Sequence, residues 1–481
     1  GTTFAWFTDT ASTGVNKIVS GNLKVDIIGE SSDSHVEKLN FKKAATTDAE
    51  AGAEILWEPG CRYLTEGFRI ANKGNLALKW KAQVNKGTTA ANEGNFDLLD
   101  VIDFYLVTGT GENQTETLLD EFTGNLKKTE TSDVYYIKGV MQTTAGNDYQ
   151  GLTIDGISIT VIATQDTVEN DSFDNQYDKD APLDFEPVAT ADELNAAAAA
   201  GKNVQLTQDV TLMDAVTFNK AVTIDLNGKT LTSSLNSNGY SLVTKENATI
   251  VNGTYKGTGT ARGIGAYGNL KMSHVTVDVS GLVGVACSAD NGQYIIEDST
   301  IKGGYALCNF NNNVAINISD STLEGKTIGL YHNGSNSGLN LTVTGTKINA
   351  GNNGTDATGV YISGSTATRD AGGYQKASFT GCTIKGNAAV EVKYTDLTLN
   401  NCTVIATVDR ANASYTQNNN GSTTNGFAVV STDNATNNTM PKPEGTITIN
   451  GGSYTGLIGL HSFAKIAEDF PGFVDTTYVI N

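Results

Sequence analysis

The sequence predicts an all-β protein: an antiparallel β-sandwich, then a right-handed parallel β-helix that begins with a capping helix. Three observations predict this fold class. Apolar and polar residues alternate in the first part of the chain, a unit of 20–25 residues repeats in the second part, and the 481 residues include 52 Gly but only 6 Pro. Alternation is typical of half-buried strands, and a repeat of this length is typical of a solenoid.

The first module spans residues 1–178, and its strands are expected at 23–27, 76–84 and 157–163. In each stretch every second residue is apolar, so one face of the strand lies in a core and the other in water. Turn signals such as Glu58-Pro59-Gly60 separate the stretches. Residues 179–188 are acidic, contain two prolines and lack periodicity, so we interpret them as a linker.

A short capping helix is expected at 190–200, at the start of the second module, which spans residues 189–481. Thr190 is the predicted N-cap, Glu193 its capping-box partner, and Gly201 the stop signal. Open ends of stacked sheets pair readily with other chains. We therefore expect this helix to cover the first rung, and the aromatic tail from Phe470 to Tyr478 to cover the last.

The repeat consists of two apolar residues five positions apart, with a Gly/Asn/Asp turn between them, followed by a second short strand. Spacings that exceed the period mark loops that leave the stack, at 364–376, 408–425 and 432–445. Two or three short strands per repeat favour a parallel β-helix over a propeller blade, which needs four strands. The turn units are IVNGTY (250–255), MSHVTV (272–277), IEDSTI (296–301), ISDSTL (318–323), VTGTKI (343–348), FTGCTI (379–384), LNNCTV (399–404) and INGGSY (449–454).

Charge and hydropathy exclude several classes of function. The net charge is −20, which argues against nucleic acid as a partner, because phosphate binding needs clustered Lys and Arg. No apolar run approaches 18 residues, so no membrane span is predicted. The chain opens at Gly1 without Met, which fits a processed secretory precursor.

The first module resembles the TasA/camelysin family. The matching stretches are AWFTDT (5–10), NKIVSGNLKVDI (16–27), WEPG (57–60), NKGNLALKWKAQV (72–84) and residues 147–178, the last as in gut-bacterial relatives. The resemblance implies a jelly-roll-like sandwich, export through a dedicated signal peptidase, and a place in the cell envelope or biofilm matrix. Some relatives form fibres in which the first strand of one subunit completes the next subunit's sheet. Here that assembly strand would contain Phe4, Trp6 and Phe7.

The second module resembles the pectate-lyase-like β-helix superfamily in its rung pattern, not in a catalytic motif. That superfamily contains polysaccharide lyases and glycoside hydrolases, and also adhesins and tail proteins. The fold alone does not choose among these functions.

No catalytic, metal or cofactor site is predicted. Asp298 and Asp320 occupy equivalent turns of adjacent rungs and could form a carboxylate pair, but a side chain that bonds its own turn explains them equally well. The acids Asp171, Asp174, Asp178 and Asp180 do not follow the spacing of a calcium loop, so we interpret them as solvated.

The cysteines fall into two pairs at rung spacing. Cys287 and Cys308 are expected in one slot of consecutive rungs, as are Cys382 and Cys402. Stacked neighbours lie close enough for a disulfide. The alternative is a ladder of small buried residues, which Ser299 and Ser321 favour because they take the Cys382 position in other rungs.

The candidate glycan-binding residues are tyrosines and asparagines of the second module. We expect Tyr331 and Tyr361 at matching outward positions, with Tyr267 and Tyr394 nearby and Asn311 and Asn312 in an adjacent turn. Exposed aromatic rings stack on sugar rings, and amides hydrogen-bond to hydroxyls. An ordinary asparagine ladder with scattered surface tyrosines is the alternative.

Together these features predict a secreted or cell-surface structural and adhesive protein that binds a polysaccharide, host or matrix surface through the β-helix. One alternative is a β-helix polysaccharide lyase or glycoside hydrolase. Another is a biofilm-type fibre subunit that self-associates by exchanging its N-terminal strand.

Overall fold

The computed structural model divides the chain into two units, Gly1–Phe185 and Glu186–Asn481. It describes residues 11–12, 17–18, 24–36, 39–42, 57–84, 96–109, 111–150, 159–165, 185–332, 337–351, 357–415, 424–432, 445–461, 465–469 and 477–480.

The first unit contains two antiparallel sheets that share a core, and a separate antiparallel pair of β1 (Ala11–Ser12) and β2 (Lys17–Ile18). One sheet has the order β3-β6-β11-β5-β4, with β8 on β11 and β9 on β8; the other has the order β10-β7-β12. Trp80 and Leu78 of the smaller sheet and Phe68, Ile70 and Ile137 of the larger sheet pack in this core. The predicted sandwich is therefore confirmed. Its strands are β3 (Val25–Gly29), β4 (Phe41–Lys42), β5 (Arg62–Thr65), β6 (Phe68–Asn72), β7 (Leu78–Val84), β8 (Ile102–Thr108), β9 (Thr115–Leu118), β10 (Gly124–Leu126), β11 (Tyr135–Met141) and β12 (Ile159–Gln165).

The expected linker is shorter than its sequence suggests. Residues 186–188 form strand β13 (Glu186–Val188), which pairs in parallel with β14 (Val204–Leu206). Val188 is apolar and fully buried, which is why this end of the acidic segment joins the β-helix.

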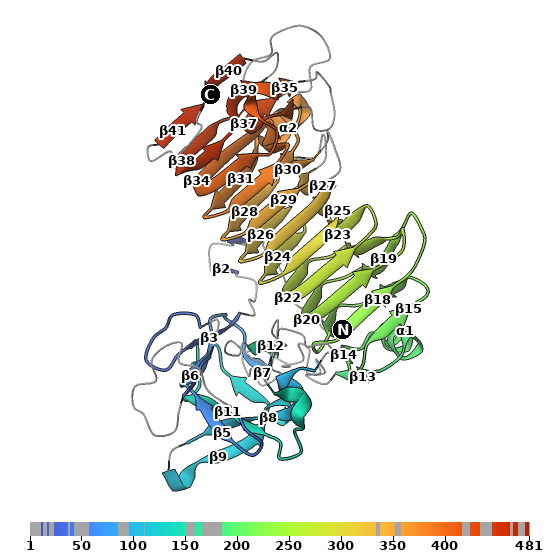
Figure 1. Ribbon diagram of the computed structural model, residues 1–481, viewed down its shortest axis with the longest axis vertical. Helices are drawn as coiled ribbons and strands as arrows, with labels where there is room; N and C mark the ends of the chain where they lie inside the picture. The colour runs from blue at the N-terminus through green and yellow to red at the C-terminus, as the bar shows by residue number, and fades with distance from the viewer. Residues whose placement is uncertain are drawn as a thin grey trace. The chain divides into compact units, whose positions relative to one another are not determined.

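The second unit is a parallel β-helix whose rungs follow one another along the ribbon from β14 to β39 (Figure 1). Each rung contributes to three walls, which we call A, B and C. The core column of wall C shows the register: Ile264, Val285, Leu307, Leu330, Val360 and Val390 pair in succession. Parallel crossovers are right-handed in nearly all proteins, and the right-handed parallel β-helix predicted from the sequence is the fold observed.

Most strands belong to one wall, and several longer strands bend so that they belong to two. The first rung is β14, β15 (Val210–Leu212) and β16 (Val216–Phe218). Wall A contains β17 (Val222–Asp225), β24 (Gln293–Glu297), β26 (Ala315–Ser319), β28 (Asn340–Thr344) and β31 (Gln375–Thr380); wall B contains β18 (Thr230–Ser233), β29 (Lys347–Ala350) and β32 (Thr383–Gly386). Wall C contains β19 (Tyr240–Thr244), β21 (Arg262–Ala266), β23 (Val283–Cys287), β30 (Thr358–Ile362), β33 (Ala388–Lys393), β37 (Phe427–Thr432) and β39 (Leu457–His461). Walls A and B share β20 (Ala248–Gly257), β22 (Leu270–Val279), β34 (Thr395–Ala406) and β38 (Ile447–Thr455), and walls B and C share β25 (Thr300–Asn309) and β27 (Thr322–His332).

A left-handed residue turns the chain from wall A to wall B in each rung. Asp298 and Asp320 take this position with φ of 45° and 47°. Gly, Asn and Asp tolerate this conformation best, which explains the repeating turn in the sequence. The same position is held by Asn252, His274, Gly345, Gly381, Asn401 and Gly451. The fold thus accounts for Asp298 and Asp320 as turn residues.

Both ends of the β-helix carry added elements. Helix α1 (Ala191–Ala200) starts at Thr190, whose side chain accepts from the Glu193 N–H, and Leu194 is buried in the β-helix core. At the far end β41 (Thr477–Ile480) pairs antiparallel with β38, so that Tyr478 lies opposite Ile449, and β40 (Lys465–Asp469) pairs with β39. Phe470 lies outside the described residues. No helix among the described residues is long and apolar enough to cross a membrane.

Candidate functional site: a charged groove and a tyrosine face

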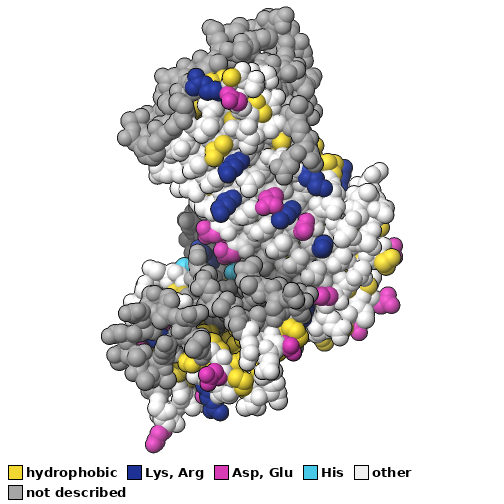
Figure 2. Space-filling model, in the orientation of Figure 1, with side chains coloured by type: hydrophobic (Ala, Val, Ile, Leu, Met, Phe, Trp, Pro, Cys, Tyr) yellow, Lys and Arg dark blue, Asp and Glu magenta, His cyan; other side chains and the backbone are white. Residues whose placement is uncertain are grey.

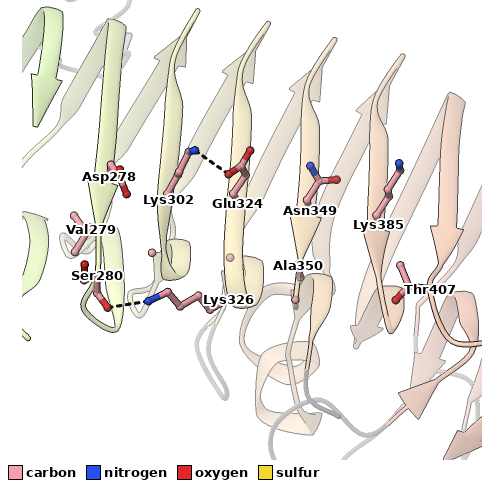
Figure 3. A pocket seen from close by; sticks show the side chains of 13 residues that line it. Asp278, Val279, Ser280, Lys302, Glu324, Lys326, Asn349, Ala350, Lys385 and Thr407 are labelled. Carbon is pink, nitrogen blue, oxygen red and sulfur yellow. Dashed lines mark hydrogen bonds and ion pairs between the residues drawn. The ribbon is translucent and has the colours of Figure 1, made fainter. Parts of the chain in front are cut away.

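A groove of about 720 Å³ runs across several rungs of wall B. Its side chains come from equivalent positions, because Asp278, Lys302, Glu324, Asn349 and Lys385 are successive register partners (Figure 3). The preceding residue of each strand is apolar and lies in the core, so these five side chains point outward. The groove therefore presents one polar column along the β-helix axis.

Glycines help to hollow the groove where wall B turns toward wall C. A Cβ atom on Gly325 would lie 1.8 Å from the Ile328 carbonyl oxygen, and one on Gly303 would lie 2.5 Å from the Gly284 nitrogen. Any larger residue would force the turn open, so glycine lets the chain bend tightly beneath the column.

Charges of both signs alternate along the groove. The Nζ of Lys302 lies 3.2 Å from an oxygen of Glu324, and Lys326 donates to the Ser280 carbonyl oxygen at 3.3 Å, across the rung between them. Asp278 and Lys385 have no ion-pair partner among the residues that the structure describes, so a carboxylate and an ammonium stand available at different rungs. Figure 2 shows Lys and Arg gathered with Asp and Glu over the middle of the β-helix.

Sequence reasoning missed this groove, although a signal was present. Each residue of the column directly follows one of the repeated turn units: Lys302 follows IEDSTI and Glu324 follows ISDSTL. Reading the charges of that one position down the repeat would have found the column. The tight turns from wall B toward wall C, which make the column the floor of a groove, leave no comparable signal in the sequence.

The column presents charged and amide side chains to a ligand. The side chain of Glu324 is 43% exposed and lies 3.2 Å from Lys302 Nζ. The column offers donors and acceptors in alternation, which is what a chain of sugar hydroxyls requires.

The tyrosine face lies on the outer side of wall C. Tyr331 and Tyr361 are register partners and their rings stack, with centroids 5.6 Å apart. Tyr305 extends the stack, 4.8 Å from Tyr331, and Phe310 meets Tyr331 edge-on. Burial raises the pKa of Tyr331 to about 12, and the ring is half-buried. The predicted matching positions of Tyr331 and Tyr361 are thus observed.

Two of the four expected tyrosines are not exposed. Tyr361 is completely buried and Tyr394 is 7% exposed. The segment that leaves the stack after β30 and contains α2 (Thr366–Gly372) explains the burial of Tyr394, because a Cβ on Gly364 would lie 2.8 Å from the Tyr394 Cβ. Tyr394 also has a φ of 50°, so it is a turn residue. The expectation of exposure is therefore wrong for both residues.

Tyr267 is exposed as expected, at 41%. Its ring lies edge-on to Tyr240, 6.4 Å between centroids, and Lys245 Nζ lies 4.3 Å above it. The exposed part of the tyrosine face therefore consists of Tyr267 with the half-buried Tyr240, Tyr305 and Tyr331.

The two candidate asparagines belong to a turn ladder. The side-chain oxygen of Asn312 accepts from the Ser337 N–H at 2.9 Å. The backbone N–H of Asn312 donates to the side chain of Asp290. The Asn311 N–H donates to the side chain of Asn309. These contacts occupy one acceptor of Asn312 and leave its amide at the surface, where Asn312 is exposed.

The two cysteine pairs differ in register. Cys287 pairs with Asn309, and Cys308 pairs with Ala286, so the two thiols point to opposite sides of wall C. Cys287 lies in the β-helix core and Cys308 under the tyrosine face. The expectation of one shared slot is wrong for this pair, because a shift of one residue reverses the face of a strand. Cys382 and Cys402 do share a slot, one residue before the partners Thr383 and Thr403.

Other expected sites lie outside the described residues. These are the assembly strand with Phe4, Trp6 and Phe7, and the linker acids Asp171, Asp174, Asp178 and Asp180. In the part of the chain that is described, no group of three His, Cys, Asp or Glu side chains is arranged to hold a metal ion.

Comparisons with known proteins give distant structural likeness only. Neither a family model nor a curated protein matches the sequence. The chain is similar to the Dettilon tailspike protein, at 9% identity and a TM-score of 0.30, over 55% of this chain and 67% of the tailspike. It is also similar to a variant catalytic domain of GH87 alpha-1,3-glucanase in complex with nigerose, at 12% sequence identity and a TM-score of 0.28, over 80% of this chain and 85% of that domain. A variant of the GH87 alpha-1,3-glucanase catalytic domain in complex with tetrasaccharides is also similar. It has 12% sequence identity and a TM-score of 0.25, and the match covers 86% of this chain and 81% of that domain. Likeness at this level assigns no function.

Proposed function

We propose that the β-helix binds a carbohydrate chain, and that the protein acts as an exported structural and adhesive protein. The observation that carries the proposal is the groove in wall B. Lys302, Glu324 and Asn349 occupy successive rungs there, and strands of successive rungs lie about 4.8 Å apart. A linear polymer lying along the β-helix axis would meet a donor or an acceptor at each rung.

The tyrosine face supplies a second contact of the kind that carbohydrates use. Tyr267 is 41% exposed and Tyr331 is half-buried on wall C, and aromatic rings at a surface are groups on which sugar rings stack. Asn311 and Asn312 lie in the turn that follows Phe310, from which their amides can reach a ligand on that face. Polysaccharides of a host or matrix surface are the proposed partner.

Titration calorimetry of the full chain against a panel of soluble polysaccharides, with pull-down on insoluble ones, tests the proposal. Lys385→Ala and Asn349→Ala should each weaken binding several-fold, because each removes a polar contact that desolvation makes costly to lose. Lys376→Ala, an exposed lysine on wall A, is the matched control and should bind as the unmodified chain does. Equal affinity of all variants for the polysaccharide would exclude the groove as the binding site.

The tyrosine arm of the experiment uses Tyr267→Ala and Tyr331→Ala. Loss of binding in these variants but not in the groove variants would move the site to wall C. Measurements of released reducing ends and of lyase product absorbance run alongside, and turnover abolished by Asp278→Asn or Glu324→Gln would make the protein an enzyme instead.

Export and assembly form the second part of the proposal. The likeness of residues 1–178 to the TasA/camelysin family supports a cell-surface or matrix location, which antibody detection in culture supernatant, surface and cytosolic fractions tests. Fibre assembly through Phe4, Trp6 and Phe7 is tested by light scattering of the chain with and without residues 1–8. Identical monomeric behaviour at high concentration would argue against assembly.

A further inference from the structure

Cys382 and Cys402 occupy equivalent places at the corner between walls A and B. Thr380 pairs with Asn400 on one side of them, and Thr383 pairs with Thr403 on the other, so the two cysteines face each other across adjacent rungs. Parallel strands at this spacing place the two Cα atoms about 4.8 Å apart, within the 4.4–6.8 Å that a disulfide spans.

The two thiols also point the same way. Cys382 Sγ lies 3.5 Å from the carbonyl oxygen of Thr380, and Cys402 Sγ lies 3.5 Å from that of Asn400, two residues earlier in each case. A side-chain hydrogen bond joins the thiols, and it lowers the pKa of Cys382 and, together with burial, raises the pKa of Cys402. Each sulfur therefore already has the other as its neighbour.

The same corner holds hydroxyl residues in earlier rungs. Ser299 Oγ donates to the Glu297 carbonyl at 2.7 Å, and Ser321 Oγ to that of Ser319 at 2.7 Å. Thr346 repeats the contact with Thr344 at 2.8 Å. Serine is therefore sufficient for the corner to fold, and the two cysteines add a chemical property that packing does not require.

We propose that Cys382 and Cys402 form a disulfide that joins adjacent rungs when the protein meets an oxidising environment. In exchange with a small disulfide such as oxidised glutathione, the Cys382 thiolate attacks one sulfur and releases a glutathione thiol. The Cys402 thiolate then attacks the mixed disulfide and releases the second thiol. The two electrons and two protons of the cysteines pass to the glutathione, so the exchange balances.

The link is confined to this pair. Cys287 and Cys308 are separated by nearly the same number of residues, but their side chains lie on opposite sides of wall C. Cys61 lies in the first unit, where it packs beside Met141 and Trp57. The chain thus contains its own control pair, with similar spacing and unsuitable geometry.

The test counts thiols in the full chain. The protein is held in a glutathione redox buffer, once folded and once during refolding from denaturant, because both thiols are only 1% exposed. It is then unfolded with an alkylating reagent, and the intact mass is measured. We expect two fewer alkylated thiols than the five that the sequence contains. Trypsin cuts after Lys385 and Lys393, so the link should appear as two joined peptides.

Variants make the assignment specific. Cys382→Ser and Cys402→Ser should keep the fold, since serine fills this corner in other rungs, and should leave every remaining thiol open to alkylation. Cys287→Ser should still lose two thiols to the link. The oxidised form should melt at a higher temperature than the reduced form, and this difference should vanish in Cys402→Ser. Five alkylated thiols in both preparations, or a link between other cysteines, would overturn the proposal.

Discussion

Lys302 and Glu324 are register partners on adjacent rungs, and their charged atoms lie 3.2 Å apart in the groove of wall B. Both side chains are 43% exposed, so water screens their attraction. Exposed ion pairs contribute about 0.2–1 kcal/mol to stability. The pair therefore arranges charge along the groove more than it stabilises the β-helix.

We predict that Lys302→Gln and Glu324→Gln each lower the free energy of unfolding by less than about 1 kcal/mol. Their coupling in a double-mutant cycle, measured by denaturant titration, should fall when salt is raised. A coupling of several kcal/mol that is insensitive to salt would show that the pair is structural.

Asp26 should make the first unit sensitive to acid. Burial opposes ionisation of Asp26, but hydrogen bonds and charges from His35 and Lys73 prevail and lower its pKa from 3.8 to about 2. The pKa of Asp26 is lower in the folded protein than in the unfolded chain, so its ionised form stabilises the fold at pH values above the unfolded pKa. This stabilisation is lost as the pH falls from about 4 to about 2. His35 and Lys73 are more than a third exposed, so we expect about 1 kcal/mol after screening.

Asp26→Asn checks this prediction. The variant should be less stable than the unmodified protein at pH 5, and the difference should disappear near pH 2. Tryptophan fluorescence follows the first unit selectively, because Trp6, Trp57 and Trp80 all belong to it. A difference that persists unchanged at pH 2 would contradict the role of the carboxylate charge.

The sequence predicted the architecture because the repeat is local and periodic. The turn between walls A and B recurs with residues suited to a left-handed φ, and each such turn fixes the register of its own rung. The turn between walls B and C varies in length, so the register of wall C could not be counted along the chain. One residue of error placed Cys308 in the core beside Cys287, whereas it lies under the tyrosine face.

The candidate sites were harder to predict because segments that leave the β-helix stack decide which side chains stay exposed. Tyr331 and Tyr361 hold matching positions in the repeat, yet the β-helix leaves one half-exposed and buries the other. Tyr394 is buried against the segment that leaves the stack after β30, and no periodicity encodes the path of that segment. The groove depends in turn on short turns between walls B and C, and therefore on glycines scattered through the chain.

The left-handed turn positions should discriminate between glycine and alanine. Asn401 has a φ of 49° at the position that Gly381 fills one rung earlier. An L-residue other than Gly or Asn costs about 1–2 kcal/mol in this conformation. Asn401→Ala should therefore destabilise the β-helix by about 1 kcal/mol, whereas Asn401→Gly should stay within a few tenths; thermal unfolding by circular dichroism measures both. Equal melting temperatures would show that the turn relaxes.

Gly124 should be intolerant of any side chain. It lies opposite Trp80 in the β7–β10 pair, and a Cβ at this position would come within 2.4 Å of the indole ring. Trp80 is 1% exposed at the centre of the sandwich core and has little room to move. Overpacking of this kind costs about 1–3 kcal/mol. Gly124→Ala should lower the midpoint of fluorescence-detected unfolding, whereas Gly146→Ala, with open space around it, is the control.

Helix α1 should keep the first rung of the β-helix from pairing with other chains. Thr190 accepts from the Glu193 N–H at 3.2 Å, as an N-cap does, and the Glu193 carboxylate accepts from the Ala189 N–H at 2.6 Å, one residue before the N-cap. Leu194, Ala197 and Ala198 are buried on the first rung. Thr190→Ala should cost about 1 kcal/mol by removing the N-cap hydrogen bond.

Deletion of residues 190–200 should have a larger consequence, because it uncovers apolar side chains and open strand ends together. Light scattering of the deletion variant should show concentration-dependent association, while Thr190→Ala stays monodisperse. Glu193→Gln, which preserves the hydrogen bond but removes the charge, should behave as the unmodified chain. A deletion variant that remains monodisperse and fully folded would mean that the first rung needs no cover.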